Sequence, residues 1–274
     1  MKRTLGFAPI VILIVVAALA AGTGLLFYAK NKKSAEVHEE NGNITLSVNE
    51  ASSSVPNLYQ TPNNPSLISS KAFCPDPFVF DLPIDINKAT SVLYPGQVRG
   101  GDFKAHGGFR FDNSRPEEII VTAPIDAPVV VGARYPVNGI IQYTMEFEHP
   151  CGVRYRLGHL LTLAPKFQAL AETLPLPQTL DSRTNAVVQT DVKKGEVVAT
   201  AVGLPGNTFL DWGVYDYRQE NEVSKDPIWR ASHTSDTYRY GVCWFDWISP
   251  ENRVKVLALP SADGVSGKQS DFCK

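Results

Sequence analysis

Short apolar runs alternate with polar, turn-forming residues from about residue 72 onward and predict a chain built mainly of β-strands. Runs rich in β-branched and aromatic residues, each bounded by turn-forming residues, lie at 118–123, 129–131, 139–147, 153–157, 196–201, 209–215, 240–245 and 254–257. Apolar residues at helical spacing appear at 166–174, where we expect one short helix. The pattern predicts an all-β, mostly antiparallel sandwich or open barrel.

A continuous apolar run near the start predicts a membrane segment. Two basic residues precede an uncharged run from Leu5 to Tyr28, which is longer than the roughly 20 residues that a helix needs to cross a bilayer core. Small residues at 18–20 leave a cleaved signal peptide as the alternative, although the apolar run continues past them. We therefore expect residues 1–30 to be a transmembrane signal anchor of a single-pass protein whose C-terminal domain lies outside the cytoplasm.

Composition divides the rest of the chain into three parts. Residues 31–70 are polar and poor in large apolar side chains, which is typical of a flexible linker. Residues 71–260 carry the strand pattern and predict the folded β-rich domain, and 261–274 read as a loose C-terminal tail. The formal net charge of -2 gives no bulk basic field, so nucleic acid is not an expected partner.

Cysteine usage adds information about the compartment. The four cysteines are well separated and form no Cys-x-x-Cys pair: Cys74, Cys151, Cys243 and Cys273. An even number of cysteines behind a secretory-type segment favours disulfides in an oxidising compartment, and free buried thiols are the alternative. Four cysteines allow three pairings, and the sequence does not choose among them.

The segment from His106 to Phe111 carries the most informative candidate chemistry. Residues four apart on a strand point to the same face, and a histidine with an acid at that spacing suits two ligands of one zinc ion. Here the fourth residue after His106 is Arg110, whose guanidinium has no lone pair to offer a metal. The spacing therefore favours an enzyme-like fold while placing metal chemistry in doubt.

Five segments, taken in order, resemble motifs of the lysostaphin-type (LytM-like) zinc metallopeptidases, which cut peptide bonds in peptidoglycan. His-Gly-Gly-Phe-Arg-Phe at 106–111 resembles the family's His-x-Gly-x-Asp-Phe, and Leu-Gly-His-Leu at 157–160 resembles its Tyr-x-His-Leu. Phe-Leu-Asp-Trp-Gly-Val at 209–214 stands where the family has His-Leu-His-Phe-x-Val. The two supporting segments are the Ala-Pro strand pair and the Lys-x-Gly turn, at 121–130 and 192–198.

The resemblance implies zinc ligands at positions 106, 110 and 211, with assisting histidines at 159 and 209. His106 and His159 match this pattern, whereas Arg110, Phe209 and Asp211 depart from it. Two remaining ligands, His106 and Asp211, are fewer than the three that a catalytic zinc needs. We therefore expect an ion pair between Arg110 and Asp211 in place of the metal.

These observations favour a peptidase-like domain that lacks catalytic activity, needs no cofactor, and binds a cell-wall peptide or glycan or an envelope protein through the relic cleft. The first alternative is a divergent zinc metallopeptidase, with His106 and Asp211 as ligands, Asp112 or Asp102 as the third, and His159 as the catalytic residue. The second is a structural envelope or assembly protein. Without the resemblance, His159 reads as a packed histidine between Leu157 and Leu160.

Overall fold

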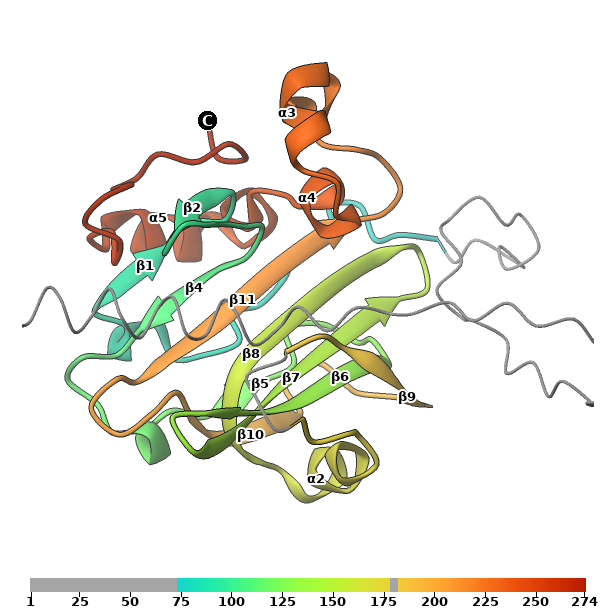
Figure 1. Ribbon diagram of the computed structural model, residues 1–274, viewed down its shortest axis with the longest axis vertical. Helices are drawn as coiled ribbons and strands as arrows, with labels where there is room; N and C mark the ends of the chain where they lie inside the picture. Colours follow the sequence, from blue (N-terminus) through green and yellow to red (C-terminus); the bar gives the residue numbers. More distant parts are fainter. Residues whose placement is uncertain (1–72, 178–181) are drawn as a thin grey trace, which may run out of the picture. The chain divides into compact units, whose positions relative to one another are not determined.

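The computed structural model describes residues 73–177 and 182–274 (Figure 1). The chain divides into two units, and these residues belong to the second, 64–274. The expected anchor at 1–30 and linker at 31–70 lie outside the described residues. Among the helices that the structure does describe, none is long and apolar enough to cross a membrane.

An antiparallel sheet of nine strands forms the body of the described domain. Its main path runs β1 (Ser91–Leu93), β4 (Gly107–Arg110), β11 (Phe209–Asp216), β8 (Val153–Leu163), β7 (Ile140–His149), β6 (Val129–Val137) and β9 (Asn185–Thr190). A branch leaves β8 through β10 (Val197–Val202) to β5 (Val121–Thr122), and a separate hairpin joins β2 (Gln97–Arg99) to β3 (Asp102–Lys104). The predicted antiparallel β-rich fold is thus confirmed.

Alternation along the central strands separates a core face from a polar face. Buried apolar side chains of neighbouring strands pack into one cluster, among them Met145, Phe147, Tyr155, Leu157, Leu210, Trp212 and Val214. The residues between them point to the opposite face, because strand side chains alternate with period two. We call this opposite side of β4, β11, β8 and β7 the polar face, and it carries the candidate site.

The longest hairpin is specified by its turn. Val137 of β6 pairs with Ile140 of β7, so the loop between them has only two residues, Asn138 and Gly139. Both have positive φ, 51° and 78°, as the two-residue turn that follows the strand twist requires. An Asn-Gly pair tolerates this backbone well, which fixes the register of β7 and of the polar side chains on it.

Helices are more numerous than the sequence pattern predicts. The expected helix is α2 (Pro165–Glu172), but α3 (Pro227–Ser232), α4 (Asp236–Tyr240) and α5 (Pro250–Ala258) are also present, with short 3-10 turns at η2 (Ile86–Lys88), η3 (Pro116–Glu118), η4 (Glu222–Lys225) and η5 (Trp244–Trp247). The predicted strands at 240–245 and 254–257 are therefore wrong. Residues 240–245 include the end of α4 and the start of η5. At 254–257, Ser249 accepts a hydrogen bond from the first turn of α5 and precedes a proline, and this start signal outweighs local β propensity.

Two disulfides close the fold, Cys74–Cys151 and Cys243–Cys273. The second bond attaches the C-terminal segment, so 261–274 is not a loose tail. This segment also contacts β2, because the side-chain amide of Gln97 donates to the carbonyl oxygens of Gly267 and Gln269 at 3.0 and 2.6 Å. The formation of disulfides is confirmed, and the pairing that the sequence left open is now assigned.

Candidate functional site

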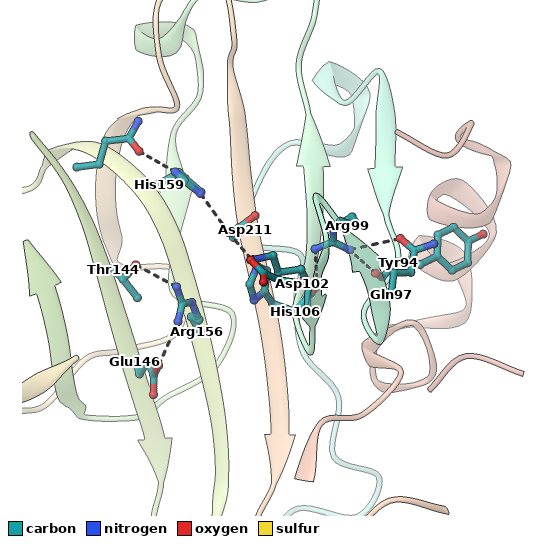
Figure 2. Close-up of polar contacts among 12 residues, drawn as sticks. Tyr94, Gln97, Arg99, Asp102, His106, Thr144, Glu146, Arg156, His159 and Asp211 are labelled. Atoms are coloured by element: carbon teal, nitrogen blue, oxygen red, sulfur yellow. Dashed lines mark hydrogen bonds and ion pairs between the residues drawn. The ribbon is translucent and has the colours of Figure 1, made fainter. Parts of the chain in front are cut away.

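Three side chains that the sequence singled out meet on the polar face of the sheet (Figure 2). His106 lies just before β4, His159 lies on β8, and Asp211 lies on β11 between them. The Nε2 atoms of His106 and His159 lie 3.1 and 3.3 Å from the same atom, Asp211 Oδ2. We call this arrangement the His-Asp-His cluster. Its side chains are 17%, 23% and 9% exposed in the order His106, His159, Asp211, so solvent reaches the two rings.

A β-bulge aims His159 at the cluster. Tyr143 and Met145 of β7 pair with Leu160 and Leu157 of β8, so β8 holds one extra residue between the two pairs. His159 has a φ of 59°, in the left-handed region where histidine is enriched among side-chain-bearing residues. Leu157 and Leu160 both face the core, and the bulge lets the imidazole between them turn to the polar face. Bulges of this kind re-aim a side chain.

Gln142 on β7 fixes the hydrogen-bonding state of His159. The Gln142 amide nitrogen donates to the Gly203 carbonyl at 2.6 Å, so its Oε1 faces His159 Nδ1, also at 2.6 Å. An amide oxygen only accepts, so His159 Nδ1 must carry the hydrogen of this bond. The other ring nitrogen of His159, Nε2, faces Asp211 Oδ2 at 3.3 Å.

Electrostatics favour an ionised Asp211 and a neutral His106. Burial alone would raise the pKa of Asp211, but His106 and His159 beside it hold that pKa well below its usual range. Burial lowers the pKa of His106, and Asp211 opposes this effect only in part. The cluster therefore keeps a buried carboxylate charged by hydrogen bonds from two imidazoles.

Glycine and arginine position His106. A Cβ at Gly213, on β11, would lie 2.6 Å from Tyr215 Oη and 3.0 Å from His106 Cβ, so a larger residue there would push against both side chains. Arg99 of the β2–β3 hairpin donates to the carbonyl oxygens of Tyr94 and His106 at 2.7 and 2.8 Å. The backbone that carries His106 is thereby tied to the hairpin, as Figure 2 shows.

The expected ion pair between Arg110 and Asp211 is wrong. In the strand register Asp211 pairs with Gly108, and Arg110 pairs with Phe209 instead. The Arg110 guanidinium donates to Asn207 Oδ1 at 2.8 Å and contacts Asp112 Oδ1 at 3.3 Å. Phe209 packs its ring 4.2 Å from the His159 ring. The register that decides these contacts was not readable from residue spacing alone.

The donor set does not complete the zinc site that the family resemblance implies. Asp102 pairs with Lys104 at 3.2 Å, and Asp112 accepts from the Thr90 hydroxyl at 2.9 Å. Within 73–177 and 182–274, no group of three or more His, Cys, Asp or Glu side chains is arranged to hold a metal ion. Both imidazole Nε2 atoms already face the carboxylate of Asp211. The residues therefore fit a closed hydrogen-bonded cluster better than a metal centre.

Sequence reasoning missed the charged residues beside the cluster. On β8 and β7, Arg156 pairs with Glu146 in the strand register, with 3.8 Å between Nη1 and Oε1. The Nη2 atom of Arg156 lies 3.5 Å from Thr144 Oγ1. Thr144 lies on β7, as does Gln142, the hydrogen-bond partner of His159. The order Arg154, Tyr155, Arg156 in the sequence could have revealed these charged residues, because every second side chain of a strand points away from the core.

Comparison with known proteins adds no assignment: no family model and no curated protein matches the chain. The resemblance to the lysostaphin-type peptidases therefore remains an interpretation of the five segments. What the structure contributes independently is the convergence of His106, His159 and Asp211, which come from three separate parts of the chain.

Proposed function

We propose that this protein is a membrane-anchored, extracytoplasmic domain that binds a cell-envelope component, a cell-wall peptide or glycan, over the His-Asp-His cluster without cleaving it. The observation that carries the proposal is the shared carboxylate: Asp211 Oδ2 lies 3.1 Å from His106 Nε2 and 3.3 Å from His159 Nε2. A partly exposed group of ionisable side chains on a sheet face, away from the core, is typical of a binding site.

We infer the absence of cleavage from the contacts of the two histidines and of Arg110. The Nε2 atoms of both histidines are engaged by one carboxylate, and the residue at the implied second ligand position, Arg110, binds Asn207. A hydrolytic centre of this type needs a group that activates water and another that stabilises the oxyanion. In the cluster these groups satisfy one another, so it is suited to holding a ligand.

The extracytoplasmic location is supported by the cysteines. Both pairs, Cys74–Cys151 and Cys243–Cys273, form disulfides, and such bonds persist in oxidising compartments. The anchor at 1–30 remains a prediction from its apolar run. We expect the full-length protein to fractionate with membranes. We also expect its C-terminal domain to be protected from protease that is added to the cytoplasmic side.

One observation favours the divergent zinc peptidase as a second candidate. Gln142 accepts from His159 Nδ1, and a partner on the far ring nitrogen is how proteins orient histidines that act on metals or substrates. Metal analysis separates the candidates. Two results together would establish the peptidase. The purified full-length protein would contain stoichiometric zinc and release new amino groups from cell walls, and Asp211→Asn would lose both properties.

Sedimentation with isolated cell walls tests the proposed binding. We expect the full-length protein to sediment with the walls, and Asp211→Asn to weaken binding at least ten-fold, or about 1.4 kcal/mol. Asp246→Asn is the matched control, because Asp246 forms an exposed ion pair with Arg253 at 3.0 Å. Circular dichroism must show both variants folded. Equal binding by all three proteins, or no binding by any, would refute the proposed function.

A further inference from the structure

The two disulfides differ in the surroundings of their sulfur atoms. Each bond joins one buried cysteine to one half-buried cysteine, Cys151 to Cys74 and Cys243 to Cys273. Within the part of the chain that the structure describes, an arginine donates to sulfur only at the first bond, where Arg218 Nη1 lies 2.8 Å from Cys74 Sγ. This donor distinguishes two bonds that are alike in burial.

The Arg218 side chain is held in place for this contact. Its Nε and Nη2 atoms donate to the two carboxylate oxygens of Asp216 at 2.6 and 2.9 Å, and Asp216 is only 1% exposed. The guanidinium also lies 5.8 Å from the centre of the Trp247 ring. Because the N–H donors of a guanidinium form a rigid fork, the ion pair leaves Nη1 directed at the sulfur. Asp216 offsets part of the positive charge but does not occupy this donor.

A surface hollow gives small reagents access to the same bond. The hollow is about 510 Å³ in volume, and its lining includes Cys74, Arg218, Phe73, Asp76 and Trp247. Cys151, at the other end of the bond, is 5% exposed. Thiol–disulfide exchange requires an attacking thiolate to reach one of the two sulfurs. Cys74 is therefore the half of the bond that is open to attack.

A cationic donor beside sulfur favours the reduced form of a cysteine pair. Reduction leaves a thiol or thiolate on Cys74, and a hydrogen bond from a guanidinium stabilises the thiolate. A disulfide whose reduced form is stabilised is reduced more easily. The Cys243–Cys273 bond has no such donor among the described residues, so we expect it to remain as a structural crosslink.

We propose that Cys74–Cys151 is a site of thiol–disulfide exchange with a dithiol, and that Arg218 stabilises the departing Cys74 thiolate. A thiolate of the dithiol attacks Cys74 Sγ, the S–S bond breaks, and Cys151 leaves with the electron pair and takes up a proton. The second thiolate of the dithiol then attacks the mixed disulfide and releases Cys74 as a thiolate. The dithiol leaves as a disulfide, and two electrons have passed to the protein.

Exchange at this bond would change how the start of the described domain is attached. Cys151 lies in the turn between β7 and β8, whose strands carry Gln142 and His159. Reduction would detach the segment that begins at residue 73 from this turn. The proposal does not depend on what the polar face binds, and a dithiol would act on the opposite partner of the hairpin, its turn.

Redox titration of the full-length protein in mixtures of reduced and oxidised dithiothreitol tests the proposal. After acid quenching and alkylation, mass spectrometry of the peptides gives the reduced fraction of each bond. We expect Cys74–Cys151 to be half reduced at a ratio of reduced to oxidised dithiothreitol at least ten-fold lower than Cys243–Cys273, a difference of about 30 mV. Equal ratios for the two bonds, or a lower ratio for Cys243–Cys273, would overturn the inference.

The variant Arg218→Gln isolates the donor. We expect it to raise the ratio needed for Cys74–Cys151 at least ten-fold, and an unchanged ratio would refute the role of Arg218. Arg230→Gln is the matched control, because Arg230 also donates to both oxygens of one carboxylate, that of Glu220.

A measurement on the unaltered protein decides the question if Arg218→Gln does not fold. In the reduced protein, the rate of alkylation by iodoacetamide is followed as a function of pH for each cysteine. We expect the rate at Cys74 to reach half its maximum at a lower pH than the rate at Cys273, the other half-buried cysteine. The same pH for both thiols would overturn the inference.

Discussion

Replacing Asp211 with alanine tests whether the His-Asp-His cluster contributes to stability as its geometry indicates. The substitution removes the shared acceptor of His106 and His159 and leaves both rings facing an apolar methyl group. Loss of one partner from a buried charged pair typically costs about 3–5 kcal/mol. The two bonds, 3.1 and 3.3 Å, are longer than the roughly 2.8 Å of a strong charged hydrogen bond. We therefore expect the lower end, about 3 kcal/mol.

Urea denaturation of the full-length protein at pH 7.5 measures this loss. Tryptophan fluorescence is a suitable signal, because Trp212 is the next residue on β11 and is fully buried. For a domain of this size, 3 kcal/mol corresponds to a fall in melting temperature of roughly 6–12 °C. Asp246→Ala is the control, since an exposed ion pair contributes less than about 1 kcal/mol. Equal losses in the two variants would refute the account of the cluster.

Two further predictions concern pH and the disulfides. Burial lowers the pKa of His106, so the unfolded chain takes up its proton first, and stability falls as the pH drops below about 6.5. Denaturation at several pH values should show a smaller slope in His106→Asn, and an unchanged slope would count against this assignment. Replacing Cys243 and Cys273 with serine opens a loop of 30 residues, which should lower the free energy of unfolding by about 3–4 kcal/mol; calorimetry that finds no loss would contradict the expected contribution.

Local patterns predicted much of the fold because they act within a few residues. Runs of β-branched and aromatic residues between turn-forming residues located six of the strands of the sheet. The missed helix α5 contains the β-branched residues Val254 and Val256, and the prediction gave those more weight than the Ser249 cap. Val254 looked like a strand residue, but it is 70% exposed on a helix.

The sequence predicted which residues form the site but not which contacts they make. His106, His159 and Asp211 were selected together through the family resemblance, and the structure brings them into contact. Their partners were not predictable, because contacts across a sheet depend on register, and register depends on pairings distant in sequence. Arg110 was expected to face Asp211 but pairs with Phe209, which is a difference of two residues in the register of β4 and β11. The bulge that turns His159 likewise leaves no mark in the spacing.

The bulge in β8 has a consequence for how the domain could change through evolution. Its extra residue lies between Leu157 and Leu160, which both face the core. Loss of Gly158 would restore plain alternation in the order Leu, His, Leu, with both leucines still facing inward. The imidazole would then occupy the glycine's place, against Asp211 and Arg156. A single codon thus separates a bulged strand from a regular one in which histidine takes the place of the glycine.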